Sequence, residues 1–384
     1  MTREEVLHNQ ALYQHPLYYD PLNKKPVVTV ENGGVSYAYV PEKRGVVILD
    51  YGKAEFNVYA PDAKKVRVSG WGGTMPQSYD LNPLGDGYWQ CVAEDIAGGF
   101  HYCDFFVNDV RIINSLAPVG YGKFQPANFF EMPWGEESAF YLLQDVPHGT
   151  VHTELYHSTS TGKTRICSVY TPPAYSADKK YPVLYIQHGG GENETGWLWQ
   201  GKINYICDNL ISSGETEEMI VVMNEGYAFL PIPDNDPACG RIDEVLVQDC
   251  IPFIDGKYST IADRHARAIA GLSMGGVQAN AAIIRHYDFF GSAGVFSGGF
   301  LEKGLGFDGT RLFTDPSAFA EAFDMIFIAA GQQEQPMCDD LHRRVEAYRR
   351  RGLNMHFYSW PGYHEWDVWR HAARRFMCLL FKNR

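Results

Sequence analysis

Residues 269–276 read IAGLSMGG, and Ser273 is the centre of a Gly-x-Ser-x-Gly pattern in this stretch. The short apolar run at 267–270 suits a buried strand, and the alanine-rich run at 277–284 suits a buried helix. A serine on a sharp strand-to-helix turn needs small neighbours, because a β-carbon beside it would clash with the folded-back backbone. Its hydroxyl is then exposed near a helix N-terminus, where amide N–H groups favour developing negative charge. We therefore predict that Ser273 is a catalytic nucleophile.

Length, composition and charge are those of an ordinary globular chain. With 384 residues, of which 45% are hydrophobic and 21% charged, the chain should bury a substantial core and divide into two domains. The formal net charge of −13 argues against nucleic acid or an anionic membrane as the natural partner. We interpret this charge as a contribution to solubility.

Neither a leader nor a cofactor motif is evident in the sequence. Residues 1–8 contain no apolar core of signal-peptide length, and no run of about 18 apolar residues occurs in the chain. We therefore expect a cytoplasmic protein, unless a leader has been removed. The eight cysteines are scattered without a Cys-x-x-Cys pair, so we expect buried thiols rather than disulfides or a zinc site. No glycine pattern for a dinucleotide or a phosphate loop is present, and we expect no cofactor and no metal.

The first part of the chain has the two-residue period of β-strands. Residues 34–132 contain short strands separated by turns, and apolar and polar residues alternate at 54–60 and again at 65–69. An Asn-Asp pair offers a hairpin turn between the strands expected at 100–107 and 110–113. Strands at intervals of about ten residues, with turn residues between them, predict a small all-β sandwich.

The pattern changes near residues 133–150. From residue 151 onward, apolar runs typical of buried strands alternate with helical stretches such as 244–254 and 338–351. The expected strands are 183–187, 218–223, 267–270, 294–297 and 325–330. This alternation predicts an α/β fold, with a mostly parallel sheet covered by helices on both faces. We place an N-terminal β-sandwich domain with its leading segment at 1–136 and a catalytic domain at 137–384.

A nucleophilic serine requires a base. In α/β-hydrolases the order along the chain is serine, acid, histidine, so the base should follow Ser273. His364 lies in the loop Trp-Pro-Gly-Tyr-His-Glu-Trp, directly after an apolar strand expected at 355–358, and we predict that it is the base. Other histidines fall in expected helices and should lie on the surface: His286, His342 and His371.

The base in turn requires an acid to orient it. Glu334 follows the strand that ends at Ala330, at the carboxyl edge of the sheet where functional loops of parallel sheets gather. A carboxylate there can accept the histidine Nδ1–H and stabilise the imidazolium. Asp339 and Asp340 are rivals, but they resemble acids favoured by the dipole at a helix N-terminus. We therefore predict Glu334 as the acid.

The oxyanion that forms on the substrate needs two N–H donors. One is the backbone N–H of Met274, the residue after the nucleophile. The second should come from the turn His-Gly-Gly-Gly at 188–191, which follows the first buried strand. Gly190 is the first choice and Gly191 the second, whereas His188 is given a structural role.

These motifs resemble those of the esterase D-like putative esterases, in particular the feruloyl esterases of carbohydrate esterase family 1. The resemblance spans about residues 144–384, and the motifs that carry it are at 170–175, 188–193, 249–254, 267–276 and 361–369. It implies an α/β-hydrolase fold, with Ser273 as nucleophile and His364 as base. Family members commonly carry aspartate where Glu334 stands, and glutamate can fill this role in α/β-hydrolases.

The first half resembles the immunoglobulin-like N-terminal domains related to carbohydrate-binding module family 48. Residues 57–66, 87–89 and 102–110 carry this resemblance. An exposed tryptophan in such a domain can stack on a sugar ring. Trp71, in a Gly-Trp-Gly-Gly loop, is the better candidate for exposure, whereas Trp89 is expected in the sandwich core.

The resemblance also suggests a substrate, a hydroxycinnamate esterified to a plant cell-wall sugar. Aromatic residues near the expected site either line an acyl pocket or belong to the core: Trp197, Trp199, Tyr227, Phe229 and Trp366. A cytoplasmic enzyme would meet imported oligosaccharides, which favours small feruloyl or acetyl sugar esters. The alternatives are an enterobactin-type siderophore esterase, which the net charge disfavours, an acyltransferase, and a non-catalytic carbohydrate-binding protein. A homodimer is one candidate oligomeric state.

Overall fold

The computed structural model describes residues 24–41, 43–132, 135–232, 236, 239–304 and 306–382. The chain divides into two compact units, 1–142 and 143–384. This division lies slightly beyond the boundary expected after residue 136. The short 3₁₀ helix η2 (Gly135–Tyr141) belongs to the first unit and buries Phe140 and Tyr141.

The first unit is built from antiparallel strands. Its main sheet has the order β10-β11-β8-β5-β6-β7-β4-β3, with β9 paired to β8, and a separate hairpin is formed by β1 and β2. The strands are β1 (Lys24–Glu31), β2 (Gly34–Pro41), β3 (Val46–Asp50), β4 (Lys53–Tyr59), β5 (Val66–Gly70), β6 (Ser78–Pro83), β7 (Tyr88–Ala93), β8 (Gly99–Val107), β9 (Val110–Ile112), β10 (Val119–Gly122) and β11 (Gln125–Met132). The strands expected at 54–60, 65–69, 100–107 and 110–113 thus correspond to β4, β5, β8 and β9.

The two halves of this sheet enclose one core. β6 pairs with β5 at one end and with β7 at the other, so it joins the two halves. Phe56 of β4 contacts Phe105 of β8 and Phe130 of β11 edge-on, with ring centroids 6.2 and 5.4 Å apart. Such contacts add to the burial of large apolar area. The expected sandwich core is therefore present, whereas the immunoglobulin-like assignment stays a prediction.

The two tryptophans of the first unit have protein partners. Trp89 packs against the core, and its indole N–H donates to the carbonyl oxygen of Ala60 at 2.9 Å, in keeping with the expected core position. Trp71 is partly buried: its ring stacks on Tyr102 with centroids 4.4 Å apart, and the Lys123 ammonium lies 4.4 Å from its centroid. Its indole N–H also donates to Asp104 at 2.8 Å. Trp71 is therefore less open to a sugar ring than its glycine-rich loop suggests.

The second unit contains an eight-stranded mixed sheet of order β12-β13-β15-β14-β16-β17-β20-β21. The pairs from β15 to β21 are parallel, and the hairpin β12–β13 is antiparallel. The strands are β12 (Thr150–Ser158), β13 (Lys163–Thr171), β14 (Val183–Gln187), β15 (Ile220–Asn224), β16 (Arg267–Leu272), β17 (Ser292–Phe296), β20 (Met325–Gly331) and β21 (Met355–Trp360), with a small hairpin of β18 (Lys303–Gly304) and β19 (Phe307–Asp308).

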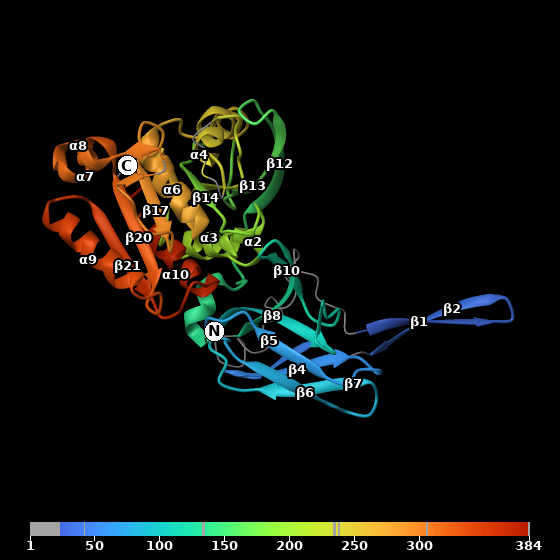
Figure 1. Cartoon of the computed structure of the whole chain (residues 1–384). Helices are drawn as coiled ribbons and strands as arrows, with labels where there is room; N and C mark the ends of the chain where they lie inside the picture. The colour runs from blue at the N-terminus through green and yellow to red at the C-terminus, as the bar shows by residue number, and fades with distance from the viewer. Residues whose placement is uncertain are drawn as a thin grey trace. The chain divides into compact units, whose positions relative to one another are not determined.

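Helices cover both faces of this sheet (Figure 1). They are α2 (Gly196–Trp199), α3 (Ile203–Ser212), α4 (Ile242–Val245), the π-helical turn η3 (Leu246–Cys250), α5 (Ile251–Lys257), the 3₁₀ turn η4 (Arg264–Ala266), α6 (Met274–Arg285), α7 (Thr310–Thr314), α8 (Pro316–Ala322), α9 (Met337–Arg350) and α10 (Trp366–Met377). Ile326 and Ile328 of β20 join a core with α6 and α9. Phe327, between them, contacts Phe376 of α10 on the opposite face, with centroids 5.6 Å apart. Successive side chains of β20 therefore point to opposite faces of the sheet and contribute to the core on each face.

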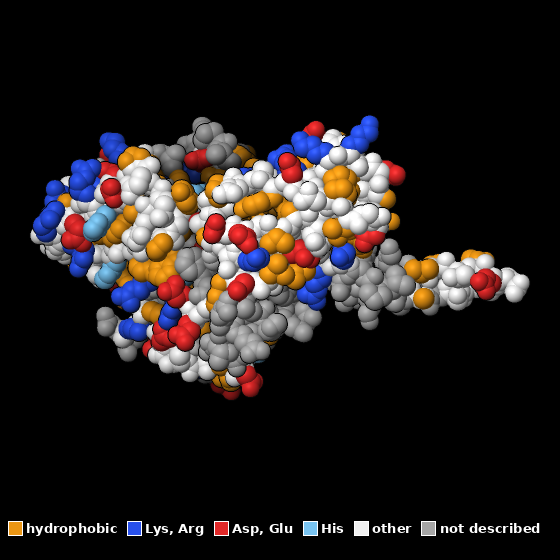
Figure 2. Space-filling view, turned by 90° about the horizontal axis from the view of Figure 1, so that it is seen from below, with side chains coloured by type: hydrophobic (Ala, Val, Ile, Leu, Met, Phe, Trp, Pro, Cys, Tyr) orange, Lys and Arg blue, Asp and Glu red, His pale blue; other side chains and the backbone are white. Residues whose placement is uncertain are grey.

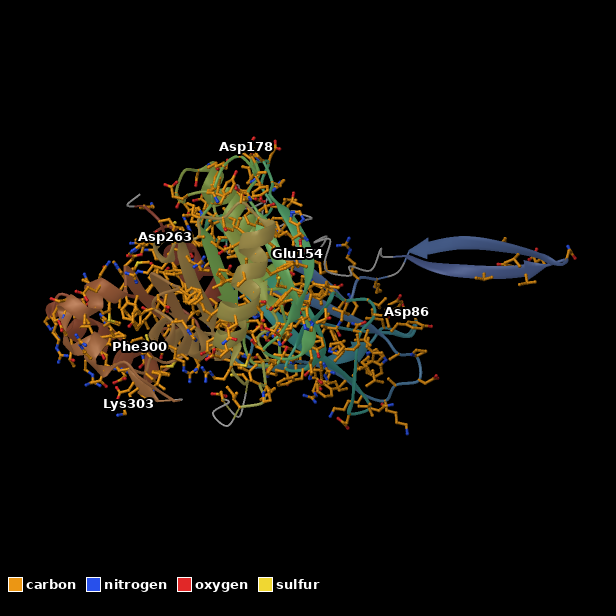
Figure 3. The ribbon with its side chains drawn as sticks, turned by 90° about the horizontal axis from the view of Figure 1, so that it is seen from above. Asp86, Glu154, Asp178, Asp263, Phe300 and Lys303 are labelled. Carbon is orange, nitrogen blue, oxygen red and sulfur yellow. The ribbon has the colours of Figure 1, made fainter. Side chains whose placement is uncertain are left out.

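Two local features differ from the expectation. The helix expected at 244–254 is divided into α4, η3 and α5, because Pro252 in the first turn of α5 has no N–H to donate to the preceding turn. The hairpin β12–β13 was not identified from apolar runs, because β12 is exposed along much of its length. Glu154 of β12 is labelled in Figure 3. It accepts hydrogen bonds from Tyr258 and Lys257, which ties the hairpin to the end of α5.

The remaining expectations concern cysteines, membrane helices and charge. All eight cysteines are free thiols, and six of them are buried, as expected. Among the described residues, no helix combines the length and apolar character needed to cross a membrane. Figure 2 shows acidic and basic side chains interspersed over the face that it presents, so the net charge of −13 is not gathered into one acidic field there.

His371 corrects the expectation of a surface histidine. It is 6% exposed, because α10 contacts both the sheet and α3 and is buried on several sides. Its ring stacks on Trp360 with centroids 3.6 Å apart. Burial, and then the nearby cations Arg374 and Arg370, lower the pKa of His371 from 6.5 to about 3. The imidazole is therefore neutral in the folded protein at neutral pH.

This shift predicts a pH-dependent stability. As pH falls below 6.5, the unfolded chain takes up a proton at His371 that the folded protein does not bind until about pH 3, so acid destabilises the fold. The free energy of unfolding should fall by about 1–2 kcal/mol between pH 6.5 and pH 5. His371→Phe, which retains a ring against Trp360, should flatten this slope in urea titrations. The same change at the exposed His342 is the control, and an unaltered slope in His371→Phe would contradict the assignment.

Candidate active site

Ser273 lies on the turn between β16 and α6, with a left-handed backbone of φ 52° and ψ −118°. A non-glycine residue in this region carries strain of about 1–3 kcal/mol, which the surrounding structure must hold. The Ser273 N–H donates to the carbonyl oxygen of Phe296 at 2.8 Å. A β-carbon at Gly271 would lie 2.3 Å from the Gly275 backbone, and one at Gly275 would lie 2.5 Å from the carbonyl oxygen of Gln187. The turn is thus as tight as the sequence pattern predicts.

The predicted acid and base meet at this serine. The Ser273 hydroxyl oxygen lies 2.8 Å from His364 Nε2, and His364 Nδ1 lies 2.6 Å from Glu334 Oε1. Glu334 follows β20 and His364 follows β21, so neighbouring parallel strands bring both to one edge. Because an ionised carboxylate only accepts, Nδ1 carries the proton and Nε2 is open to the serine hydroxyl. The 48% exposure of the His364 side chain leaves the pair accessible to a substrate.

The Glu334 carboxylate is held on its other side. Its Oε2 accepts from the Ser297 hydroxyl at 2.6 Å and from the Gly331 N–H at 2.7 Å. Trp369 of α10 donates its indole N–H to Ser297 at 2.9 Å. Burial acts to raise the pKa of Glu334, but hydrogen bonds from His364, Ser297 and the Gly331 N–H outweigh it and lower the pKa. Glu334 is therefore ionised at neutral pH, as a partner of an imidazolium must be.

Ser297 is a functional residue that the sequence analysis missed. It directly follows β17, at the same carboxyl edge of the sheet, and it has a left-handed φ of 49°. A serine at the end of a buried parallel strand is the signal that was present in the sequence. Its hydroxyl connects α10 to the acid.

The rival acids and histidines have other partners. Asp339 accepts from Gln335 at 3.1 Å, and Asp340 pairs with an arginine one turn further along α9. Both lie in the first turn of α9, as the helix-dipole interpretation predicts. His286 contacts Asp243 at 3.3 Å, and His342 stacks on a phenylalanine ring. None of these hydrogen bonds or ring contacts involves Ser273.

The glycine turn after β14 leaves one backbone N–H without an acceptor among the described residues. Gly189 donates to Glu192 at 3.0 Å, and Gly191 donates to the Tyr227 hydroxyl at 2.7 Å. Gly190 is exposed, and its N–H has no acceptor within the described residues. The buried His188 donates through Nδ1 to Gly189 at 2.8 Å, which gives it the expected structural role. This geometry favours Gly190 over Gly191 as the second oxyanion donor, beside the Met274 N–H at the start of α6.

The aromatic residues proposed for an acyl pocket need correction. Trp197 is 1% exposed and Trp366 is 2% exposed, so neither side chain can touch a substrate in this structure. Their rings pack edge-on with centroids 5.2 Å apart, and the Trp197 N–H donates to the carbonyl oxygen of Gln187 at 2.8 Å. Core packing with a satisfied indole N–H explains both residues. Trp199 and Tyr227 are partly exposed, and Phe229 is 56% exposed.

One group of side chains has the spacing of a metal site. Ligand atoms of Asp243, Glu244 and His286 lie within 4.8 Å of one another. However, Arg241 and Arg285 donate to the Asp243 carboxylate at 2.9 and 3.0 Å. Burial acts to raise the pKa of Asp243, whereas hydrogen bonds from His286 and Arg241 lower it well below its usual range. Two guanidinium groups already neutralise this carboxylate, so the arrangement is that of a buried ion-pair network.

Comparison with known proteins gives the family. The family model described as Putative esterase matches residues 158–374, more than half of the chain, and this span contains Ser273, Glu334 and His364. The chain belongs to the putative esterase family. Membership of an esterase family, which the sequence led us to expect, is thereby confirmed. The match lies within the second unit, residues 143–384, which we call the catalytic unit, and it confirms the resemblance for that unit.

Curated relatives extend the similarity to the first unit. An endo-1,4-beta-xylanase/feruloyl esterase of Xylanibacter ruminicola is 34% identical over 363 residues, which cover 89% of this chain and 46% of the relative. An endo-1,4-beta-xylanase of Acetivibrio thermocellus is 34% identical over 143 residues, which cover 34% of this chain and 12% of the relative. The chain therefore spans less than half the length of either relative.

Solved structures show the fold. A CE1 ferulic acid esterase from Anaeromyces mucronatus is similar with a TM-score of 0.52 and 22% identity, over 63% of this chain and 94% of that one. Enterochelin esterase from Shigella flexneri is similar with a TM-score of 0.61 and 16% identity, over 88% of this chain and 96% of that one. The predicted α/β-hydrolase fold of the catalytic unit is confirmed.

The tight turn predicts that Gly275→Ala is strongly destabilising. Its β-carbon would meet backbone oxygens that cannot move without shifting β14, so we expect a loss of about 3 kcal/mol in the free energy of unfolding. Gly256→Ala is the matched control, because Gly256 lies in α5 with open space around it. That change should raise stability by about 0.5–1 kcal/mol. Equal effects of the two substitutions in chemical denaturation would refute this account of the turn.

The hydrogen bonds of Glu334 predict the outcome of its replacement. Glu334→Gln removes the charge that stabilises the imidazolium and presents an amide to His364 Nδ1, which disfavours the productive tautomer. We expect kcat for ester hydrolysis to fall about 10³–10⁴-fold, with the fold retained by circular dichroism. Asp339→Asn, the same chemical change at the rival acid, should leave kcat within about twofold. A large loss at Asp339 with none at Glu334 would reverse the assignment.

Proposed function

We propose that this protein is a serine carboxylic ester hydrolase that acts on acylated sugars and releases ferulate or a related hydroxycinnamate from plant cell-wall oligosaccharides. The observation that carries the proposal is the hydrogen-bonded set of Ser273, His364 and Glu334, at 2.8 and 2.6 Å. The substrate class is supported by the similarity to the xylanase/feruloyl esterase of Xylanibacter ruminicola over 89% of the chain.

The proposed reaction begins with attack of the Ser273 hydroxyl oxygen on the ester carbonyl carbon. His364 Nε2 takes the hydroxyl proton, and the Glu334 carboxylate stabilises the imidazolium. The negative charge on the former carbonyl oxygen is met by the N–H groups of Met274 and Gly190. Such a donor contributes about 3–4 kcal/mol to the transition state, which corresponds to a factor of about 10²–10³ in rate.

The second half of the reaction regenerates the enzyme. The tetrahedral intermediate collapses, the bond to the alcohol oxygen breaks, and His364 gives its proton to the leaving alcohol. Water then attacks the acyl-serine ester with His364 again acting as base, which releases the acid and restores the Ser273 hydroxyl. The sequence of two displacements predicts ping-pong kinetics.

The proposed acyl group is aromatic and the proposed alcohol is a sugar. Trp199 and Tyr227 are partly exposed aromatic side chains. Trp199 follows the turn at residues 188–191 in the sequence, and the Tyr227 hydroxyl contacts that turn directly. A planar hydroxycinnamoyl ring is the kind of group that such side chains bind. In a cytoplasmic setting, which we also propose, the substrates would be short imported oligosaccharides rather than polymer.

A siderophore ester is the second candidate substrate. The Shigella flexneri enterochelin esterase shares the fold over 88% of this chain, a larger share than the ferulic acid esterase covers. That likeness concerns the fold, and the net charge of −13 disfavours a strongly anionic iron complex as substrate. The feruloyl sugar ester is therefore preferred, and the siderophore is kept in the substrate panel.

The panel that tests this function contains methyl ferulate, a feruloylated arabinose–xylose oligosaccharide, an acetylated xylo-oligosaccharide and ferric enterobactin. We expect turnover of the feruloyl oligosaccharide well above the others, and loss of this turnover in Ser273→Ala. Labelling by a fluorophosphonate should occur in the wild type and be absent in Ser273→Ala.

The other outcomes separate the alternatives. Turnover of enterobactin alone would replace the substrate class but retain the serine mechanism. Turnover of the acetylated oligosaccharide above the feruloyl one would identify an acetyl-sugar esterase. Absence of the fluorophosphonate adduct, together with binding of the oligosaccharide, would favour a non-catalytic carbohydrate-binding protein.

A further inference from the structure

The turn at residues 188–191, which we call the oxyanion turn, is held by hydrogen bonds on both sides of Gly190. The Gly189 N–H donates to Glu192 Oε2 at 3.0 Å, and the Gly191 N–H donates to the Tyr227 hydroxyl at 2.7 Å. The N–H of Gly190, between them, is the one that remains for a substrate. Fixed neighbours on each side give a short turn little freedom to rotate, so the direction of the Gly190 N–H depends on these two hydrogen bonds.

Glu192 also contacts the start of α10, the helix that follows His364. Its second oxygen, Oε1, accepts from the indole N–H of Trp366 at 3.0 Å. Trp366 is the first residue of α10 and stands two residues after His364. One carboxylate therefore connects the turn that would bind the oxyanion with the segment that carries the base.

The anchor at Trp366 is rigid. The side chain is 2% exposed and packs edge-on against Trp197 and Trp369, with ring centroids 5.2 and 5.4 Å apart. Trp197 is itself fixed through its N–H to the carbonyl oxygen of Gln187, at the end of β14. The tryptophans that the sequence analysis assigned to a pocket thus form the support behind Glu192.

The turn lies directly against the nucleophile. A β-carbon at Gly189 would be 2.5 Å from Leu272 Cδ1 and 3.6 Å from Ser273 Cβ. A shift of the turn therefore changes the distance between the Gly190 N–H and the carbonyl oxygen of an ester attacked by Ser273. Because oxyanion donors act on the charge that develops in the transition state, a small shift alters the rate more than it alters substrate binding.

The Glu192 carboxyl group could instead act through its charge. Removal from water raises the pKa of Glu192, while the Gly189 N–H, His188, the Trp366 N–H and His364 act to lower it. A charge close to His364 would affect the base itself. The experiment must therefore distinguish positioning of the turn from an electrostatic effect on the histidine.

We propose that Glu192 is a positioning residue, which sets the place of the Gly190 N–H by tying the oxyanion turn to Trp366. The inference rests on the serine-esterase function proposed above. A carboxyl group is suited to this task because both of its oxygens accept hydrogen bonds. The amide of glutamine has a single acceptor oxygen, so in Glu192→Gln either Gly189 or Trp366 faces an NH₂ group.

The test compares para-nitrophenyl acetate with its thionoester analogue, in which sulfur replaces the carbonyl oxygen. Sulfur is a weak hydrogen-bond acceptor, so the thionoester gains little from the oxyanion donors. In Glu192→Gln we expect kcat for the oxygen ester to fall about 10²–10³-fold with KM within about twofold. The thionoester should slow far less, so the ratio of the two rates should fall by a similar factor.

Two further variants complete the design. Glu194→Gln is the matched control, the same change at a partly buried glutamate two residues along, and it should leave the ratio unchanged. Trp366→Phe keeps an aromatic ring but removes the N–H donor together with part of the buried indole. It should lower the ratio in the same direction, which provides a test if Glu192→Gln does not fold. Rates of Ser273→Ala serve as the background.

The outcomes distinguish the inference from the function on which it rests. Equal slowing of both esters in Glu192→Gln, with a shifted pH profile of kcat/KM, would show a charge effect on His364 and overturn the positioning role. An unchanged ratio in both Glu192→Gln and Trp366→Phe would overturn it as well, while the wild type remains an esterase. Hydrolysis that survives in Ser273→Ala would remove the proposed function and the inference together.

Discussion

The left-handed backbone at Ser273 constrains much of the catalytic unit. At φ 52° the chain turns from β16 into α6 within one residue, and helix and strand then approach so closely that a β-carbon at Gly271 or Gly275 would meet backbone atoms. The Ser273 N–H donates to the carbonyl oxygen of Phe296, at the end of the neighbouring strand β17. The parallel sheet thus holds a strained turn in place and exposes its hydroxyl. Loops from β14, β20 and β21 reach the same edge and complete the site around it.

Most of the candidate site could be predicted because parallel strands place their carboxyl ends together. Ser273, Glu334 and His364 each follow a largely apolar strand, and this position, together with the helix-dipole interpretation of Asp339, selected Glu334 as the acid. What the sequence did not reveal depends on packing. Trp197 and Trp366 are aromatic residues of the kind that line binding pockets. Only their burial shows that they belong to the packed core behind the site. Ser297 was missed because its role depends on Glu334 and Trp369, which lie far from it in the sequence.

In the fold, too, elements with a strong local sequence pattern were predicted, whereas elements held by distant contacts were not. Alternating residues predicted β4 and β5 well, because one face of each strand is buried in the sandwich core. The exposed strand β12 has no strong apolar signal, and it is held by Glu154 through partners about a hundred residues away. His371 was expected on the surface because it falls in a helical stretch, yet α3 and the sheet bury it. Burial of polar helix residues is a tertiary effect that periodicity does not report.

The order of the active-site residues along the chain has a consequence for folding. His364 and Ser273 are 91 residues apart, and Glu192 and Trp366 are 174 residues apart. Each of these contacts closes a long loop, and β21, which leads to His364, is the last strand at one end of the sheet. Closing a loop costs entropy that rises with its length, so we expect contacts of this kind to form after local ones. Acquisition of a reactive serine should then report the completion of the catalytic unit, after most of its secondary structure has formed.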